Sequence, residues 1–158
     1  RFNEEAEKED LVARARQARL NPGTVITLAS LIQAEGARPG DLPKVSRVIY
    51  NRVEKDMPLQ FDSTVVYALG KRTLTVTNQD LQYDSPYNTY KYKGLPPGPI
   101  GNPGNAAIEA ALKPEKGPWL FFVTTDPDRG ITKFASTYEK QLELEKEFRA
   151  WQRANPGN

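Results

Sequence analysis

The side chain that could most directly do chemistry is a single carboxylate, Glu35, on the apolar side of a predicted helix. It follows Ile32 by three residues and Leu31 by four, the spacing that places side chains on one helix face. Burial there would raise its pKa. A rise from about 4.3 to about 6 would increase the protonated fraction at pH 7 from ~0.2% to ~10%, as a general acid requires.

The residue after Glu35 also has a functional interpretation, and Glu35 itself has a structural one. Gly36 follows the carboxylate directly, and we interpret its missing side chain as room for a ligand to approach. The structural alternative for Glu35 is a residue at the fringe of the core, with its apolar stem buried and its head in water. Periodicity alone leaves both interpretations open.

The amino-acid composition limits the kinds of catalysis that this chain could perform. The 158 residues include 22 basic and 20 acidic ones, a net charge of +2, and neither His nor Cys. Catalysis by Ser-His-Asp or by a thiol, disulfides and most zinc sites are therefore excluded. Acid–base catalysis must use Asp, Glu, Lys or Tyr. With no Asp-rich loop for a divalent cation, we expect no metal and no cofactor. The balanced charge also argues against nucleic acid as a partner.

The elements that must position Glu35 are mostly helical. Asn21 is predicted to cap a helix over 22–36, and Asp41 to cap another over 42–55 with Leu42, Val45, Val48, Ile49 and Val53 facing inward. Further helical segments are predicted from Asp62 to Gly70, at 77–82 with a capping pattern, at 105–113, and from a Ser136–Glu139 capping box to about 153. Residues 119–125 and 131–137 flank DPDRG and predict a hairpin.

The predicted fold class is therefore α+β, mostly helical with a small antiparallel sheet and a long Pro- and Gly-rich loop at 85–104. We expect this loop to be ordered, because Tyr, Leu and Ile are interspersed among its prolines. The predicted organisation is a connector helix at 1–20 from a missing N-terminal region, one domain at 21–154, and a disordered tail at 155–158. No apolar run is long enough to cross a membrane.

Several segments occur together in the order and spacing of one family. They are LASLIQAE, VIYNR, LQFDSTVVYALG, SPYNTYKYKGLPPGPIGNPG, AAIEAALKP and FAST. Over roughly residues 21–145 the chain resembles the YceG-like endolytic murein transglycosylases. The long and unusual YNTY…GLPPGPI segment makes this resemblance specific.

The resemblance implies an enzyme that cleaves the β-1,4 bond between N-acetylmuramic acid and N-acetylglucosamine inside peptidoglycan strands and leaves 1,6-anhydro ends. It places the family's catalytic Glu at Glu35. It also implies a single-pass anchor in the missing N-terminal region, action on the extracytoplasmic face of the bacterial plasma membrane, and peptidoglycan synthases as neighbours. Thr132 and Lys140 occupy positions where many relatives carry His, so any substrate binding by those histidines must differ here.

Other side chains are candidates to bind the substrate. Gln60 and Asp62 would share a face of an extended segment and could bind sugar hydroxyls or orient Glu35; Asp62 could equally be a helix cap. Aromatic rings could stack on sugars or pack the loop, and amides could bind N-acetyl groups or brace it. These candidates are Tyr87, Tyr90, Tyr92, Asn88 and Asn102.

Three further residues have mainly structural interpretations. Asn51 and Arg52 could buttress the site, although a surface salt bridge is preferred for Arg52, and Glu139 is interpreted as the acid of the capping box. Two other functions also stay open. One is a hydrolytic muramidase that uses Glu35 with Asp62 as the second carboxylate. The other is a module that binds peptidoglycan without cutting it.

Overall fold

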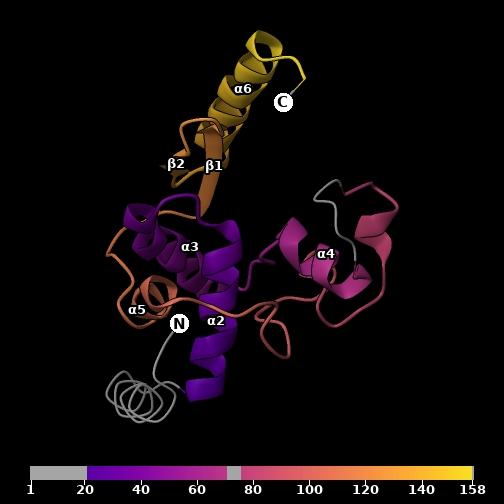
Figure 1. Ribbon diagram of the computed structural model, residues 1–158, viewed down its shortest axis with the longest axis vertical. Coiled ribbons are helices and arrows are strands. Elements are labelled where there is room, and N and C mark those ends of the chain that lie inside the picture. Colours follow the sequence, from indigo (N-terminus) through magenta and orange to yellow (C-terminus); the bar gives the residue numbers. More distant parts are fainter. Residues whose placement is uncertain (1–20, 71–75, 158) are drawn as a thin grey trace.

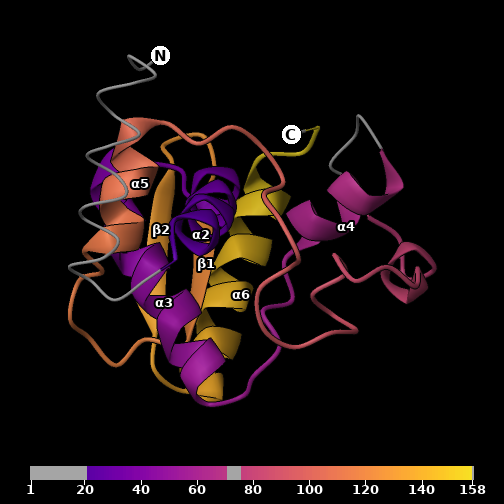
Figure 2. The ribbon, with the colours of Figure 1, turned by 90° about the horizontal axis from the view of Figure 1, so that it is seen from below.

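The computed structural model describes residues 21–70 and 76–157, and its architecture confirms the predicted α+β class. Three helices form a central group, α2 (Pro22–Glu35), α3 (Leu42–Glu54) and α5 (Asn105–Leu112). A hairpin of β1 (Phe121–Asp126) and β2 (Ile131–Ala135) extends from this group together with α6 (Tyr138–Ala154). On the other side, α4 (Asp62–Leu69) and the long loop form a separate lobe (Figures 1 and 2).

The core lies where α2, α3 and α5 meet. Helix α2 is buried along most of its length, and α5 contributes small side chains that let the helices approach closely. The buried residues of this cluster are Val25, Leu28, Ala29, Leu31, Ile32, Leu42, Val45, Ile49, Leu59, Phe61, Ala107, Ala110 and Ala111. This packing fixes α2 and therefore the direction in which its last residue, Glu35, leaves the helix.

The starts of the first two helices differ from each other. The Asn21 side chain accepts hydrogen bonds from the backbone of Gly23 and Thr24, which confirms the predicted cap of α2. Asp41 occupies the predicted cap position of α3, but it also ends a 3-10 turn with helical backbone angles, and its side chain makes no capping bond. The predicted inward face of α3 is wrong at Val53, which is 42% exposed near the end of the helix.

The hairpin forms as predicted, with Phe122 opposite Phe134 and an irregularity between Thr124 and Asp126. The capping box predicted for the next helix is wrong by one residue. Thr137 is the cap of α6, and its hydroxyl accepts a hydrogen bond from the backbone N–H of Lys140. The residue before it, Ser136, is exposed.

The start of α4 departs from the prediction in a way that matters for the site. Phe61 occupies the cap position without a side-chain bond, and Asp62 is the first residue of the helix itself. The predicted extended segment is wrong at Gln60, whose φ of 55° lies in the left-handed region. The expectation that Gln60 and Asp62 share one face of an extended segment is therefore wrong. Gly70 ends the helix in the left-handed conformation, as predicted.

The loop between α4 and α5 is held by specific hydrogen bonds. Thr77 and Asp80 cap each other reciprocally, as their spacing predicts. Further along, the N–H groups of Ile100 and Gly104 donate to the side chains of Ser30 and Gln33 on α2. The Pro- and Gly-rich segment is thus tied to the helix that carries Glu35.

Some expectations concern other parts of the chain. The connector helix predicted at 1–20 lies outside the described residues. Residues 155–157 form a short turn after α6, in which the Asn155 side chain donates to the carbonyl of Trp151. Within residues 21–70 and 76–157, the helices are all too short or too polar to cross a membrane.

Candidate active site

Glu35 is the last residue of α2, and its carboxyl group faces the first turn of α4. The hydroxyl of Ser63 donates a hydrogen bond of 2.5 Å to Oε2 of Glu35. The residue is partly buried, because its stem continues the apolar face of α2 while its carboxyl group reaches toward α4. The contact joins residues that lie 28 positions apart in the sequence.

The surroundings of Glu35 raise its pKa to about 7. Burial is the largest cause, because it removes water from the charged form. The Ser63 hydrogen bond acts in the opposite direction, and the negative charge of Asp62 adds a smaller upward contribution. At neutral pH roughly half of the Glu35 side chains therefore carry a proton. This protonated fraction is larger than the ~10% that a pKa of about 6 would give at pH 7.

Asp62 is part of the same cluster, through Tyr90. The Tyr90 hydroxyl donates a hydrogen bond to Oδ1 of Asp62. Burial is the main cause that raises the pKa of Tyr90, and the charges of Asp62 and Glu35 raise it further. Because Asp62 and Ser63 are adjacent on α4, the Tyr90–Asp62 and Ser63–Glu35 hydrogen bonds bring Tyr90, Asp62 and Glu35 into one neighbourhood.

Arg52, on α3, is not a surface residue. The preferred interpretation as a surface salt bridge is wrong, because Arg52 is only 8% exposed. Its Nε donates to the carbonyl of Leu120, and its Nη1 donates to the carbonyls of Pro58 and Leu59. Arg52 therefore ties α3 to the segment before β1 and to the segment before α4, as the buttress alternative expected.

Asn51 makes a similar connection to the segment before the hairpin. Its amide donates to the carbonyls of Gly117 and Trp119, at 3.1 and 2.8 Å. Asn51 and Arg52 thus attach two backbone segments to α3: the segment before the hairpin and the segment before α4.

The remaining candidates fall into two groups. Asn88 is fully buried, and its amide donates to the carbonyls of Leu81 and Tyr83 and accepts from the N–H of Tyr90. These contacts agree with the loop-bracing alternative. Gln60 and Asn102 are exposed, so their amide groups are accessible to a ligand.

The other tyrosines also have partners. The ring of Tyr87 lies 5.0 Å from that of Tyr67 on α4, which agrees with a packing role. Tyr92 donates a hydrogen bond to Asp84 in the same loop. Tyr90 is thus the tyrosine of the three whose hydrogen bond leads to Asp62 and the neighbourhood of Glu35.

Thr132 and Lys140, the positions where many relatives carry His, each make a polar contact within the hairpin or α6. The hydroxyl of Thr132 is 3.0 Å from that of Thr124 across the hairpin, and Lys140 pairs with Glu143 on α6. Glu139 lies exposed in the first turn of α6.

The interpretation of Gly36 as room for a ligand is wrong. A Cβ atom at this position would lie 2.1 Å from Cδ2 of Leu42 and 3.0 Å from the carbonyl oxygen of Ile32. The space is thus occupied by the core residue Leu42. Gly36 allows α3 to pack against the end of α2 and so supports Glu35 indirectly.

Ser63 is the site residue that the sequence reasoning missed. That reasoning considered acids, amides and rings, whereas a hydroxyl in an apolar helix has the usual appearance of a surface or capping residue. The available signal was its place directly after Asp62 in the first turn of a helix. Only the packing of α4 against α2 shows that it reaches Glu35.

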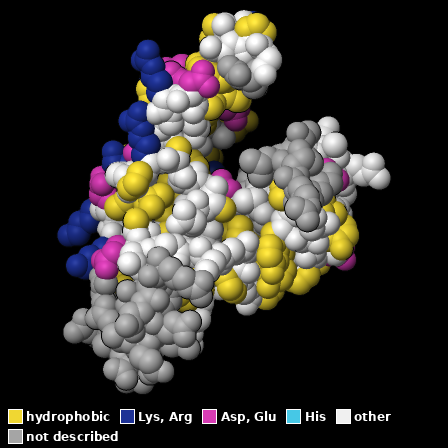
Figure 3. Space-filling model, viewed as in Figure 1, with side chains coloured by type: hydrophobic (Ala, Val, Ile, Leu, Met, Phe, Trp, Pro, Cys, Tyr) yellow, Lys and Arg dark blue, Asp and Glu magenta, His cyan; other side chains and the backbone are white. Residues whose placement is uncertain are grey.

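The outline of the molecule is open between the arm formed by the hairpin with α6 and the lobe formed by α4 with its loop (Figure 3). In Figure 1, α2 ends near the base of this opening. A long ligand could therefore pass the end of α2 between the two walls. Among the described residues, no group of three or more metal-binding side chains is close enough to hold a metal ion.

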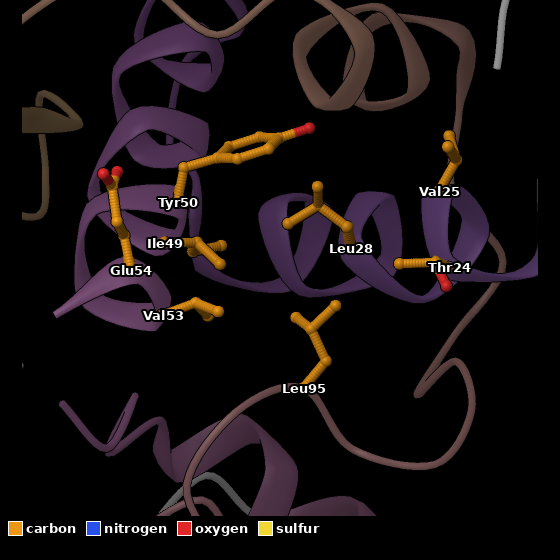
Figure 4. A pocket seen from close by; sticks show the side chains of 8 residues that line it. All are labelled: Thr24, Val25, Leu28, Ile49, Tyr50, Val53, Glu54 and Leu95. Carbon is orange, nitrogen blue, oxygen red and sulfur yellow. The ribbon is translucent and has the colours of Figure 1, made fainter. Parts of the chain in front are cut away.

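Two cavities lie elsewhere, at the start of α2. One of about 310 Å³ is apolar and lies between α2, α3 and the loop, where Leu28, Val53 and Leu95 approach each other (Figure 4). The hydroxyl of Tyr50 points out of it and donates to the carbonyl of Ala111 on α5. The other, of about 370 Å³, lies between the first turns of α2 and the loop at 95–99.

Comparison with known proteins shows the family to which this chain belongs. The profile of the YceG-like family matches residues 1–147. An endolytic murein transglycosylase of Bacillus subtilis (strain 168) is 44% identical over 124 residues, which are 78% of this chain and 34% of that protein. One of Streptococcus pneumoniae (strain D39) is 38% identical over 125 residues, 76% of this chain and 22% of that protein.

A solved structure is similar as well. The crystal structure of a YceG-like protein from Listeria monocytogenes has a TM-score of 0.83 and 40% sequence identity, covering 88% of this chain and 45% of that one. The present chain spans less than half the length of each of these three proteins.

Proposed function

Because the chain belongs to the YceG-like family, we propose that residues 21–154 form the catalytic domain of an endolytic murein transglycosylase, with Glu35 as its single general acid and base. The observation that carries this proposal is the environment of Glu35. Its pKa of about 7 lets it hold a proton at neutral pH and also release one. Two relatives that carry the name endolytic murein transglycosylase support the substrate class.

The proposed reaction needs one proton carrier. Protonated Glu35 donates to the glycosidic oxygen between N-acetylmuramic acid and N-acetylglucosamine, and the bond from C1 to that oxygen breaks with its electron pair leaving on the oxygen. The resulting carboxylate then takes the proton of the C6 hydroxyl of the same muramic acid, whose oxygen bonds to C1. The product is a 1,6-anhydro end, Glu35 regains its proton, and water is not consumed.

Several exposed or half-buried polar side chains are candidates to bind the glycan strand. Asp62 is exposed, and its Oδ1 is held by Tyr90, which leaves the carboxylate oriented for a sugar hydroxyl. Gln60 and Asn102 offer exposed amides for hydroxyl or N-acetyl groups. The ring of Tyr90, half-buried beside Asp62, offers a flat face of the kind that stacks on a pyranose. Tyr87 and Asn88 have structural partners and are weaker candidates.

The setting of the full-length protein follows from the same proposal. Peptidoglycan lies outside the plasma membrane, so we place the domain on the extracytoplasmic face. We propose that a region N-terminal to these 158 residues anchors it in the membrane, close to peptidoglycan synthases.

The test is digestion of purified peptidoglycan in H₂¹⁸O, followed by mass spectrometry of the glycan ends. We expect 1,6-anhydro ends without ¹⁸O in the wild-type protein. Glu35→Gln should lose at least ~10²-fold activity, because general acid–base catalysis contributes that much. Glu139→Gln, an exposed carboxylate on α6, serves as the matched control and should keep its activity.

Other outcomes would select the alternatives. Reducing ends that contain ¹⁸O would show hydrolysis, in which Asp62 could act as the second carboxylate. Retained binding with uncut strands would show a binding module. Activity of Glu35→Gln near that of the wild type would overturn the assignment of Glu35.

A further inference from the structure

We propose that Ser63 is a positioning residue for Glu35, whose hydroxyl holds Oε2 so that Oε1 is the oxygen that exchanges the proton with the substrate. This inference rests on the proposed function and assigns the orientation of its acid. It is carried by the 2.5 Å hydrogen bond between the two side chains and by the way each is anchored.

Glu35 needs an anchor of this kind. It is the last residue of α2, and the backbone turns to an extended conformation at Gly36, so no following helical turn restrains the side chain. A glutamate has three side-chain torsions, and its carboxyl group would otherwise sample several directions. A fixed donor on one oxygen removes this freedom and leaves the other oxygen in a defined place.

Ser63 is itself held in place by a network. The next residue, Thr64, is fully buried, and its hydroxyl contacts the Phe61 carbonyl at 2.7 Å and the Thr89 hydroxyl at 2.9 Å. The Thr89 hydroxyl also accepts from the N–H of Phe61 at 2.9 Å. The first turn of α4 is thereby fixed to the loop, and Ser63 projects from a rigid support.

The Ser63 hydroxyl can donate to Oε2 in both the ionised and the protonated form of Glu35 only if the proton of the acid is on Oε1. When Glu35 is ionised, Oε2 accepts from the Ser63 hydroxyl as a carboxylate oxygen. When Glu35 is protonated, Oε2 still accepts as a carbonyl oxygen, provided that the proton is on Oε1. Ser63 can therefore keep its position through the whole cycle, and the proton always moves at Oε1.

The charged and titratable groups near Glu35 act on it from several elements. Asp62 on α4 raises the pKa of Glu35 by its charge, whereas the Ser63 hydrogen bond lowers it. Burial and the negative neighbours raise the pKa of Tyr90 in the loop further above its ordinary value, so it stays neutral, and the charge of Arg52 on α3 acts on Tyr90 in the opposite direction. Asp62 and Ser63, which are adjacent on α4, thus shift the pKa of Glu35 in opposite directions.

The test compares Ser63→Ala with Ser63→Thr, which keeps a hydroxyl. Two quantities are measured: the titration of the Glu35 carboxyl carbon by ¹³C NMR, and kcat and KM against pH on purified glycan strands. For Ser63→Ala we expect a higher titration midpoint, an alkaline limb moved to higher pH, and a kcat lower by about ten- to a hundredfold at a similar KM. Ser63→Thr should restore most of both quantities.

Two further variants make the result specific. Asp62→Asn should move the Glu35 titration midpoint in the opposite direction, to lower pH, because a negative neighbour is removed. Ser136→Ala, an exposed serine before α6, should leave the midpoint and kcat unchanged. Thermal unfolding of each variant shows whether the protein remains folded.

The proposal is overturned if folded Ser63→Ala keeps the wild-type midpoint, or if Ser63→Thr fails to restore it. A loss of kcat without a shift of the midpoint would also overturn it, because it would indicate a purely structural role. The titration needs no turnover. If the wild-type protein cuts no glycan, the proposed function fails while the titration still decides whether Ser63 holds Glu35.

Discussion

The hydroxyl of Tyr90, in the loop after α4, donates a hydrogen bond to the carboxylate of Asp62 at the start of α4. This bond lies one residue from Ser63, which donates to Glu35 at the end of α2. The loop, α4 and α2 therefore meet through side chains that can each form hydrogen bonds or exchange protons.

Tyr90 offers a ring and a hydroxyl, whose contributions two variants separate. Tyr90→Phe keeps the ring and removes the bond to Asp62, and we expect it to cost about 1 kcal/mol of unfolding free energy. Tyr90→Ala also removes the ring and should weaken binding of glycan strands more than Tyr90→Phe does. Calorimetric titration with inactive Glu35→Gln as the background measures this difference. Equal binding by the two variants would contradict a stacking role for the ring.

The raised pKa of Glu35 predicts a pH-dependent stability. An unfolded glutamate ionises near pH 4.5, whereas Glu35 in the folded chain ionises at about 7. Its favourable contribution is therefore complete below pH 4.5 and is lost as the pH rises to about 7. Because Gln cannot ionise, Glu35→Gln should gain stability relative to the wild type over this range, by at most about 3 kcal/mol. Urea unfolding at pH 4 and pH 8 measures the gain. A difference between the two proteins that is the same at both pH values would contradict it.

Asn88 and Asn102 form a pair that separates bracing from binding. Asn88→Ala removes a fully buried amide with three hydrogen bonds, and we expect a loss of about 2–4 kcal/mol of unfolding free energy. Asn102→Ala changes an exposed side chain and should alter stability by less than about 0.5 kcal/mol. Urea unfolding and strand binding are measured for both. Normal stability of Asn88→Ala would contradict its structural role.

Arg52 is expected to be a major contributor to stability. Arg52→Ala leaves the carbonyls of Pro58, Leu59 and Leu120 without this donor and should cost about 3–5 kcal/mol of unfolding free energy. Arg47→Ala on the same helix is the control, because Arg47 donates to a single carbonyl at the surface and should cost about 1 kcal/mol or less. Similar losses in the two variants would contradict the buttress.

Local signals in the sequence were sufficient for most elements. The apolar spacing of α2, the cap at Asn21, the left-handed Gly70 and the DPDRG turn each depend on neighbouring residues, so the predictions hold. The errors at Asp62 and Ser136 concern which of two adjacent residues is the N-terminal cap of a helix, whereas Asp41 is at the cap position of α3 without a side-chain bond. Several polar residues in a row can cap, and tertiary packing selects among them.

The sequence by itself determined that acid–base chemistry must use Asp, Glu, Lys or Tyr, because His and Cys are missing, and that Glu35 lies on an apolar face. The tertiary structure decided how strongly its proton is held and which partner holds it. Burial, Asp62 and Ser63 all act on Glu35, and the last two lie 27 and 28 residues away in the sequence. Spacing along a helix reveals a face, but a contact between two helices depends on how the whole chain packs.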